Sequence, residues 1–388
     1  MSEWIQRRLS TLGVIITGKT PSKDNPNEWG DIYMFITPTD YANYNKFANT
    51  SIRMLSEIGM NRHKTRIIPK NSCLVTCIGS DMGKAVINGK ECFTNQQINS
   101  FIPNNEVSID FIYYYFKDNE YLLKSLGSSG SAVPILNKTD FGNIEINLPP
   151  LPEQKAIADV LSALDDKIDL LHRQNHTLEQ MAETLFRQWF VEEAQEDWEE
   201  KPLSSIATFT NGLACQKFPV QIGEQGFPVL KIKELTSGIS DTSDWATEKV
   251  KPEYIVENGD IIFAWSASLM VKIWSGQKSV LNQHLFNVKS QDYPKWFYYE
   301  WCKFHLAEFI AVAQSHATTM GHIKRKDLDE AMVKIPSSET LTTMSQTMKP
   351  LLDKRIVNAQ QIQTLETLRD TLLPKLISGE VRVNVQAA

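Results

Sequence analysis

The chain has 388 residues, of which 42% are hydrophobic and 22% charged, and its formal net charge at pH 7 is −6. This length suffices for two or three domains with their own cores, and the composition excludes a fibrous or largely disordered protein. No apolar run approaches the roughly eighteen residues of a membrane span, and the first residues lack a signal-peptide core. The five cysteines form no C-x-x-C pair, so we expect a cytoplasmic protein with reduced thiols and no membrane partner.

The negative charge is concentrated in one segment. Residues 1–150 contain 15 basic (Lys and Arg) and 14 acidic (Asp and Glu) residues, and residues 151–197 contain 4 basic and 11 acidic ones. The corresponding numbers are 15 and 16 for residues 198–336, and 6 and 5 for the remainder. The two large regions are therefore nearly neutral, so charge neither excludes nor indicates binding to nucleic acid.

Residues 1–150 predict a first globular domain of mixed strands and helices. Short apolar runs bounded by turn residues are typical of strands, and a longer apolar and aromatic segment is typical of a buried helix. We expect strands at 14–16, 33–36, 73–78 and 144–146, and a helix at 111–126.

Residues 13–20, GVIITGKT, match the Walker A pattern of nucleotide-binding loops. The interior of this match is β-branched, which favours a strand over a flexible loop. Pro21 and Pro26 then favour a turn where a phosphate-binding loop needs a helix. We therefore predict a strand that runs into an exposed loop. The alternative is an enzyme, a nucleoside triphosphatase that binds phosphate through Lys19.

Residues 151–195 predict a long helix with one narrow apolar stripe. Its apolar residues are alternately four and three positions apart, which is the heptad pattern of a helix that packs lengthwise against another helix. Prolines at 149, 150 and 152 favour a helix start at this point. The predicted seam consists of Ile157, Leu161, Leu164, Ile168, Leu171, Asn175, Leu178, Ala182, Leu185 and Trp189.

Three polar features of this helix have alternative interpretations. Asn175 is either a chance polar residue on the seam or one that sets the register by rejecting slipped pairings, and we favour the second. His172 and His176 are spaced for a shared metal, but the H-E-x-x-H pattern is missing, so surface positions are favoured. Asp165 and Asp166 are expected on a solvated face.

Residues 196–336 predict a second domain that repeats the first. The close echo of Tyr113-Tyr114 in Tyr298-Tyr299 is one example. Near the start of each domain the equivalent residues are 194 positions apart: Trp4, Leu9, Ser10 and Gly18 correspond to Trp198, Leu203, Ser204 and Gly212. Further along they are 187 positions apart: Asn71, Asn95, Gln96, Asp140 and Pro149 correspond to Asn258, Asn282, Gln283, Asp327 and Pro336.

Residues 337–380 predict a second long helix, followed by a tail at 381–388. Arg355 and Arg369 interrupt its heptad positions, which leaves its register open. Pro374 is expected to break or kink the last turns, and Gly379 to end the helix. The two helices are expected to pack antiparallel, as a pseudo-twofold axis between the repeats would require. The seam residues of the second helix are Met348, Leu352, Ile356, Ala359, Ile362, Leu365, Leu372 and Leu376.

No catalytic constellation is visible in the sequence. Residues 147–150, NLPP, only superficially resemble the catalytic loop of adenine methyltransferases, because Leu148 intervenes and no aromatic residue follows. A nuclease pattern of spaced carboxylates and lysine on strands is also missing. We therefore expect a chain that is not an enzyme.

Three motifs and the repeat resemble one known family. The motifs are LPPLPEQKAIA at 148–158, LLPKLISGE at 372–380 and IITGKTPS at 15–22. With the order domain, helix, domain, helix, they make the whole chain similar to the specificity subunits of Type I restriction–modification systems. The resemblance implies an α+β fold in which two homologous target-recognition domains are separated by two long helices, packed as an antiparallel coiled coil with a pseudo-twofold repeat.

The resemblance also implies a function. Each globular domain would read one half of a bipartite, asymmetric double-stranded DNA target, and the helices would set the spacer and dock two modification (methyltransferase) subunits. Two restriction (translocase and nuclease) subunits would complete the enzyme. This chain would need no cofactor, since S-adenosylmethionine, ATP and Mg would belong to the partner subunits. The alternative is a scaffolding protein whose two modules bind protein on a coiled-coil spacer.

Positions shared by the two domains cannot explain the reading of two different half-sites, so we expect them to be scaffold, with backbone-positioning contacts common to both domains as the alternative. Base contacts are expected on loops where the copies differ and where side chains are cationic or can form paired hydrogen bonds. The predicted DNA-binding residues are Lys19, Thr20, Ser22, Lys23, Arg62, Lys64, Ser80 and Lys84 in the first domain, and Gln216, Lys217, Ser266, Ser268, His316, Thr318, His322, Lys324 and Arg325 in the second.

Overall fold

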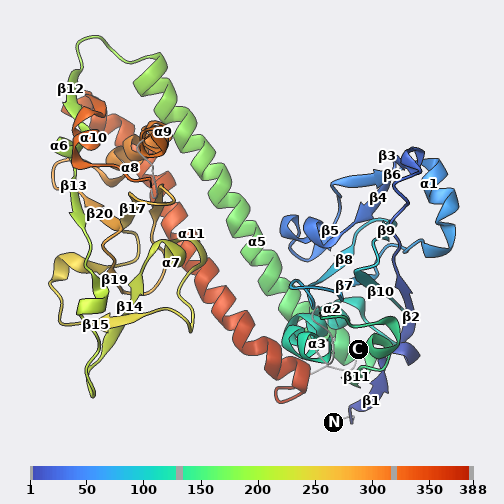
Figure 1. Cartoon of the computed structure of the whole chain (residues 1–388). Coiled ribbons are helices and arrows are strands. Elements are labelled where there is room, and N and C mark those ends of the chain that lie inside the picture. The colour runs from blue at the N-terminus through green and yellow to red at the C-terminus, as the bar shows by residue number, and fades with distance from the viewer. Residues whose placement is uncertain (1–2, 128–133, 316–320, 384–388) are drawn as a thin grey trace. The chain divides into compact units, whose positions relative to one another are not determined.

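The computed structural model describes residues 3–127, 134–315 and 321–383 (Figure 1). The chain divides into two compact units. Unit 1 is Met1–Asp166 with Thr367–Ala388, and unit 2 is Lys167–Glu366. Each unit holds one globular domain together with a segment of each long helix. The predicted α+β class is confirmed, because both domains combine sheets and helices.

The first domain is built on a five-stranded sheet with the order β2-β10-β7-β8-β5. β10 is antiparallel to both of its neighbours, pairing Asn99 with Thr17 on one side and with Val75 on the other. The smaller sheet β3-β6-β4-β9 contains the parallel pair of β4 and β9. The strands are β2 Gly13–Thr17, β10 Ile98–Pro103, β7 Cys73–Thr76, β8 Ala85–Asn88, β5 Phe47–Ala48, β3 Trp29–Gly30, β6 Arg53–Leu55, β4 Tyr33–Ile36 and β9 Cys92–Thr94.

A separate two-stranded pair, β1 (Ile5–Arg8) with β11 (Glu145–Leu148), joins the beginning and the end of this domain. The predicted strands at 14–16 and 33–36 are confirmed by β2 and β4. The predicted helix at 111–126 is two helices, because Asn119 leaves the helical conformation and caps the first of them through Tyr115. The helices are α1 Glu57–Arg62, α2 Ile109–Asp118, α3 Glu120–Gly127 and α4 Lys138–Gly142.

The Walker A match lies on β2 and the loop after it. β2 pairs antiparallel with β10, and the next helical turn in the chain is the 3-10 turn Pro26–Glu28. The prediction of a strand that runs into a loop is confirmed.

The second domain has a similar topology, with four strands in place of five in its main sheet. Its main sheet has the order β13-β20-β17-β18, its smaller sheet the order β15-β14-β19-β16 with a parallel β14–β19 pair, and β12 pairs with β21. The strands are β12 Glu199–Pro202, β13 Thr208–Asn211, β14 Gly226–Leu230, β15 Trp245–Thr247, β16 Ile255–Val256, β17 Ile261–Ala264, β18 Met270–Ile273, β19 Ser279–Leu281, β20 Leu285–Lys289 and β21 Met332–Ile335. The helices are α6 Leu203–Ile206, α7 Ile232–Ser237, α8 Lys295–Phe304, α9 Leu306–Ser315 and α10 Arg325–Glu330.

The long helices are α5 (Leu151–Arg187), which ends in a π-helical turn at Gln188–Glu192, and α11 (Ser338–Ser378). Gly379 has φ +80° and ends α11 as predicted. Of the two expected effects of Pro374, a kink stays a prediction and a break is wrong, since α11 continues through this residue. Its neighbours Leu373 and Ile377 are buried in the core of unit 1, and this packing holds the turn that the proline weakens.

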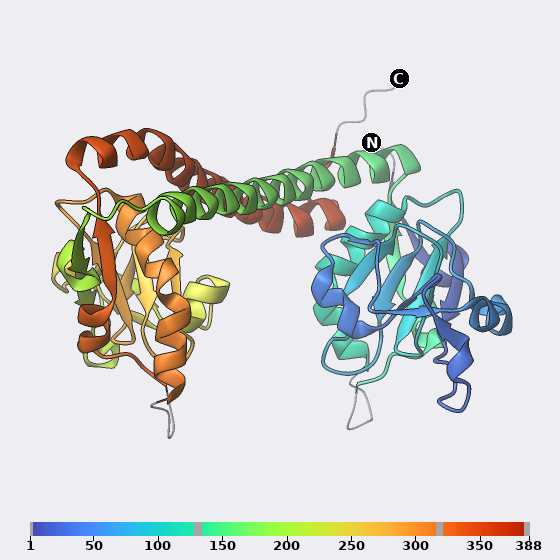
Figure 2. The same cartoon turned by 90° about the horizontal axis from the view of Figure 1, so that it is seen from above.

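Contacts within each unit show that α5 and α11 run antiparallel, side by side (Figure 2). In unit 2, Asn175 contacts Asn358 and Glu179 contacts Arg355, so residue numbers rise along one helix as they fall along the other. Of the predicted seam, Ile157, Leu161, Ile168, Leu171, Ala182, Met348, Leu352, Ile362 and Leu376 are buried, while Leu164, Asn175, Leu178, Leu185, Trp189, Ile356, Ala359, Leu365 and Leu372 are half-buried.

The seam residues pack against the globular domains as well as against the partner helix. Ile157 and Leu161 belong to the core of the first domain, and Ala182 to that of the second. Ile168, Leu171 and Ile362 instead form a small cluster between the helices. No helix among the described residues is long and apolar enough to cross a membrane.

Candidate nucleic-acid interface

Four loops of the first domain meet at one end of its main sheet, and we call them the first loop edge. Backbone hydrogen bonds join them: Lys19 N–H donates to the Thr94 carbonyl at 2.9 Å, and Gly79 N–H to the Pro134 carbonyl at 3.1 Å. Because β2 and β7 both pair with β10, the loops that follow β2 and β7 and the one that precedes β10 reach the same end of the sheet. The first loop edge comprises residues 18–25, 77–84, 94–97 and 134–137.

The second domain has the same arrangement, which we call the second loop edge. Gln283 N–H donates to the Leu213 carbonyl at 2.8 Å, and Ala267 N–H to the Gly321 carbonyl at 2.9 Å. Ala267 has φ +58°, a left-handed conformation that is uncommon for a residue with a side chain. The second loop edge comprises residues 212–218, 265–269, 282–284 and 321–324.

Shared residues hold both edges together. A Cβ atom on Gly18 would lie 2.1 Å from the Thr94 carbonyl oxygen, and one on Gly212 would lie 2.3 Å from that of Asn282. Only glycine permits this close crossing of two loops. Asn95 and Asn282 are both buried, and the Asn95 side chain accepts a hydrogen bond from the Gln97 backbone at 3.1 Å. These contacts support the expectation that shared positions are scaffold.

The side chains on the two edges differ. In the second domain, Trp265 stacks on Phe286, with ring centroids 5.6 Å apart, and its indole N–H donates to Asn211 Oδ1 at 3.2 Å. His284 Nδ1 lies 3.0 Å from Ser266 Oγ. The offset of 187 places Ile78 at the position of Trp265 and Gln97 at that of His284. The same framework therefore presents an aromatic and imidazole surface in one domain and an aliphatic and amide surface in the other.

The predicted residues of the first domain lie mostly on the first loop edge. Lys19 and Lys23 are exposed, and the Thr20 hydroxyl donates to Gln96 Oε1 at 2.8 Å. Ser22 bonds Asp24 at the turn after β2. Ser80 is exposed on the second loop of this edge.

Three of the predicted cationic residues either form an ion pair or lie outside the first loop edge. Lys84 is on the loop edge but pairs with Asp81 at 2.6 Å. Arg62 and Lys64 lie outside the edge, and Arg62 pairs with the buried Glu28 at 2.7 Å. Arg66 of the same segment donates to the Thr17 carbonyl at the end of β2, so the segment borders the edge.

The predicted residues of the second domain lie on or beside the second loop edge. Gln216, Lys217 and Ser268 are exposed, whereas Ser266 is buried and bonded to His284. His322 is half-buried, with its ring 6.3 Å from that of Trp265. Lys324 caps α10, and Arg325 is the exposed first residue of that helix. His316 and Thr318 lie outside the described residues.

Sequence reasoning missed Trp265, His284, Asn211 and Arg66. The first two could have been found, because the repeat aligns each with a residue of a different kind, and Trp265 directly precedes the predicted Ser266. The backbone contact of Arg66 with β2 carries no comparable signal.

The side chains of the two edges are suited to hydrogen bonding. Besides the aromatic, imidazole and aliphatic groups described above, they carry amides, hydroxyls and cations, which can contact base edges and phosphates. The five cysteines are buried, and burial raises the pKa of Cys77 and of Cys92 to about 12, so these thiols are not nucleophiles at neutral pH. Among the described residues, no group of three or more His, Cys, Asp or Glu could hold a metal ion.

These features define a protein with two copies of one loop framework, and comparison with known proteins identifies its family. The family described as Type I restriction modification DNA specificity domain matches residues 1–180 and 195–367, so the chain belongs to that family. Among curated relatives, the MjaIX specificity subunit of Methanocaldococcus jannaschii is 30% identical over 370 residues, which cover 87% of this chain and 84% of the relative. The HindI specificity subunit of Haemophilus influenzae is 40% identical over 148 residues, 38% of this chain and 32% of the relative.

A solved structure shares the fold. It is the S subunit of a Type I restriction–modification system from M. genitalium, with a TM-score of 0.63 and 16% identity. The match covers 99% of this chain and 97% of that one.

Proposed function

We propose that this chain is the DNA sequence-recognition subunit of a Type I restriction–modification complex. Each domain reads one half of a bipartite, asymmetric target through its loop edge, and the two long helices set the spacer between the halves. The observation that carries this proposal is one loop framework that appears twice with different side chains. A common framework docks both domains on DNA in the same way, and the differing side chains select different bases.

The proposal assigns the chemistry to partner subunits. Two modification subunits, docked on the long helices, bind S-adenosylmethionine and methylate adenine, and two restriction subunits use ATP and Mg²⁺. The chain itself is a non-catalytic cytoplasmic component. Its relatives support this role because they are named as specificity subunits of restriction enzymes. The hydrogen-bonding and cationic character of the loop edges supports it as well.

The test uses the complex with its modification subunit and a target found by genome-wide mapping of methyladenine. Lys19→Ala, Lys217→Ala and Arg325→Ala are made singly, and DNA affinity is measured at low salt. A base contact should cost about 1–3 kcal/mol, roughly five- to 150-fold in affinity, and relax one target position. A phosphate contact should instead weaken binding to all sequences alike.

The matched control is Lys70→Ala. Lys70 is exposed and precedes β7, so it lies at the opposite end of that strand from the first loop edge. Its loss should leave affinity unchanged. Unchanged affinity in all three test variants would contradict the assignment of these residues, and a complex that binds no specific DNA would favour the scaffolding alternative.

A further inference from the structure

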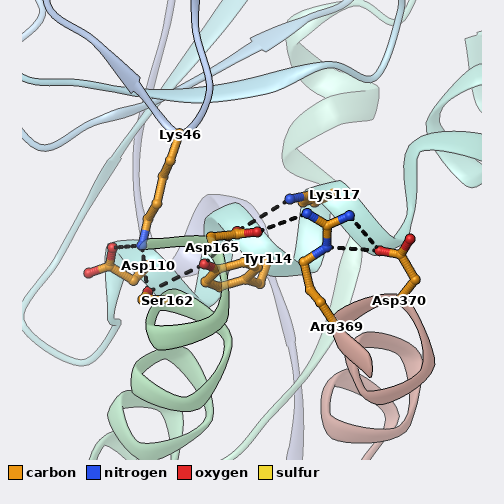
Figure 3. Close-up of polar contacts among 8 residues, drawn as sticks. All are labelled: Lys46, Asp110, Tyr114, Lys117, Ser162, Asp165, Arg369 and Asp370. Atoms are coloured by element: carbon orange, nitrogen blue, oxygen red, sulfur yellow. Dashed lines mark hydrogen bonds and ion pairs between the residues drawn. The ribbon is translucent and has the colours of Figure 1, made fainter. Parts of the chain in front are cut away.

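Unit 1 contains a cluster of partly buried charges that joins both long helices to the first domain, and we call it the first clamp (Figure 3). Asp165 of α5 is its centre. Its carboxylate accepts hydrogen bonds from Arg369 of α11 at 3.0 Å, from the Tyr114 hydroxyl at 2.9 Å and from Lys117 at 3.3 Å. The side chains of Asp165 and Arg369 are only 15% and 17% exposed. The expectation of a solvated face at Asp165 is therefore wrong, because three donors enclose it.

A neighbouring contact fastens the same domain to α5. Lys46, in the loop before β5, donates to Ser162 Oγ of α5 at 2.7 Å and pairs with Asp110 at 2.6 Å. The Tyr114 hydroxyl lies 3.4 Å from the same Ser162 oxygen, so the two sets of contacts are continuous (Figure 3).

Unit 2 contains a cluster of the same composition, the second clamp. Glu179 of α5 accepts from Arg355 of α11 at 3.0 Å and from Lys303 of α8 at 2.5 Å. Arg355 also donates to the Tyr299 hydroxyl at 3.4 Å, and Lys303 pairs with Glu183. The side chains of Arg355 and Lys303 are 11% and 17% exposed.

Both acids are ionised at neutral pH. Burial by itself would raise the pKa of Asp165, but Lys117, Arg369 and Tyr114 outweigh burial and hold this pKa below its ordinary value. Lys303 and Arg355 do the same for the pKa of Glu179. Burial lowers the pKa of Lys117, and the carboxylate of Asp165 opposes that shift. Each clamp is thus a set of charges that needs all its partners.

The two clamps are spaced alike along both helices. The acids on α5 are 179 − 165 = 14 residues apart, and the arginines on α11 are 369 − 355 = 14 residues apart. Fourteen residues are two heptads, which return a side chain to the same face of a packed helix. The arginines that interrupt the predicted seam are therefore half-buried partners of acids on the other helix.

The clamps did not arise as copies of one another through the repeat. The offset of 187 relates Asp165 to Leu352 and Arg369 to Ala182, and these two are apolar residues buried in the core of the second domain. In both clamps the acid is on α5 and the arginine on α11. The charge pattern therefore departs from the repeat symmetry and gives the pair of helices a direction.

We infer that the two clamps fix the register of α5 against α11 and the seating of each domain on the helices, and so determine which spacer length the target must have. This inference rests on the proposed function. A slip of one heptad would place Asp165 opposite Ile362 or Leu376, with no cation to pair. A slip of two heptads would re-form one acid–arginine pair and break the other. Partly buried charges without partners are strongly unfavourable, so only one register satisfies both clamps.

Asp165, Arg369, Glu179 and Arg355 are in this view positioning residues for DNA recognition. Tyr114 and Lys117 also fix the position of the first domain on the helix pair, because their hydrogen bonds to Asp165 hold α2 against it. The bases read by each loop edge do not depend on the clamps, whereas the allowed distance between the two half-sites does.

The test replaces the first clamp by the apolar pair that the repeat itself provides, Asp165→Leu with Arg369→Ala. Removing both charges leaves Lys117 as the one former partner of Asp165, and its side chain is 32% exposed and can reach water, so this variant should fold even where Arg369→Ala alone does not. The variant is assembled with its modification subunit and supplied with a DNA library in which the spacer length varies and the half-sites are fixed. Methylation at each spacer length is read by sequencing.

We expect unchanged base preferences in both half-sites and about tenfold more methylation at spacers one base pair longer or shorter, relative to the parental spacer. The control is Lys349→Ala with Asp353→Ala, an exposed ion pair on α11, which should leave the spacer distribution unchanged. An unchanged distribution in the clamp variant, or a change in the bases read, would overturn the inference. A parental protein that directs no methylation to a bipartite target would instead overturn the proposed function.

Discussion

Glu300 is a buried carboxyl group in the second domain. It lies on α8, one helical turn before Lys303, and its residue is 3% exposed. Burial raises its pKa to about 7, while Lys303 and Arg355 act in the opposite direction without cancelling the effect. Glu300 is therefore half-protonated near neutral pH in the folded protein, whereas in the unfolded chain it ionises near its ordinary pKa of 4.5.

This shift predicts a pH-dependent stability. Between pH 4.5 and about 7 the folded state holds a proton that the unfolded state has lost, so the free energy of unfolding should fall as pH rises through this window. The full effect is on the order of 3 kcal/mol at most. Glu300→Gln should remove this part of the slope.

The measurement is urea unfolding of parental and variant protein at pH 5 and at pH 8. The variant should gain stability over the parent at pH 8 and match it at pH 5. The exposed Glu330→Gln of α10 is the control and should show no such difference. An equal pH slope in Glu300→Gln and the parent would contradict the assignment.

At the level of single residues, the sequence predicted which side chains are buried better than it predicted which residues form ion pairs or hydrogen bonds with each other. The seam positions of α5 were visible from their spacing alone, because apolar side chains at heptad intervals have one simple explanation. Asp165, Arg355 and Arg369 looked like surface charges or interruptions, because a charge gives no sign in the sequence of the residue that will neutralise it. Their partners Tyr114 and Lys303 are more than fifty residues from them along the chain.

At the level of elements, the helix pair contains a polar contact of its own in unit 2. The Asn358 side chain donates to Asn175 Oδ1 at 3.0 Å and to Gln174 Oε1 at 3.4 Å, while Asn175 donates to the Arg355 carbonyl at 3.3 Å. Asn358 is fully buried, and its own side-chain oxygen has no hydrogen-bond partner. The offset of 187 places Leu171 at the position of Asn358, so this asparagine is a second departure from the repeat.

Two variants distinguish the contribution of Asn175 to the stability of the protein from its role in setting the register of α5 against α11. Asn175→Leu alone removes the acceptor of a buried amide and should lower the free energy of unfolding by about 1–3 kcal/mol. Asn175→Leu with Asn358→Leu makes the seam wholly apolar and should be more stable than the parent, but less selective for one pairing. Thermal unfolding measures the first effect, and light scattering detects additional assembly states. A double variant that keeps one assembly state would argue against register setting by Asn175.

Element boundaries were predicted well where local signals act alone. Gly379 ends α11 because it adopts a conformation that favours glycine. Pro374 does not break α11 because tertiary packing overrides its local preference, and the predicted helix at 111–126 is divided at Asn119 by a cap that no periodicity reveals. In the candidate site, the loops could be predicted from the differences between repeats. The hydrogen bonds that join them could not, because they link segments distant in the sequence.

At the level of the whole molecule, the clamps determine which deletions in the long helices can test whether these helices set the spacer length of the target. Deleting residues 168–174 from α5 alone would leave the clamp acids seven residues apart and the arginines fourteen, so both clamps could not form together. Deleting residues 359–365 from α11 as well restores equal spacing. One heptad is about 10.5 Å of helix, close to three base pairs of DNA.

We therefore expect the double deletion to direct methylation to the same two half-sites with a spacer about three base pairs shorter. The single deletion should give weak methylation without a preferred spacer. Sequencing of methylated library members distinguishes these results. A double deletion that kept the parental spacer would show that the helices do not measure the distance.

The strand pairs β1–β11 and β12–β21 have a consequence for how new variants of this protein can arise. In each pair the first strand of a domain lies beside its last, with Ile5 opposite Leu148 and Glu199 opposite Ile335. The chain thus enters and leaves each domain at one place, as in domains that tolerate insertion into other proteins. A recombination event that exchanges everything between the paired strands changes the domain but not the helix that follows. To engage the clamp on that helix, such a cassette needs a tyrosine and a lysine one helical turn apart, and at the first clamp also a counterpart of Lys46.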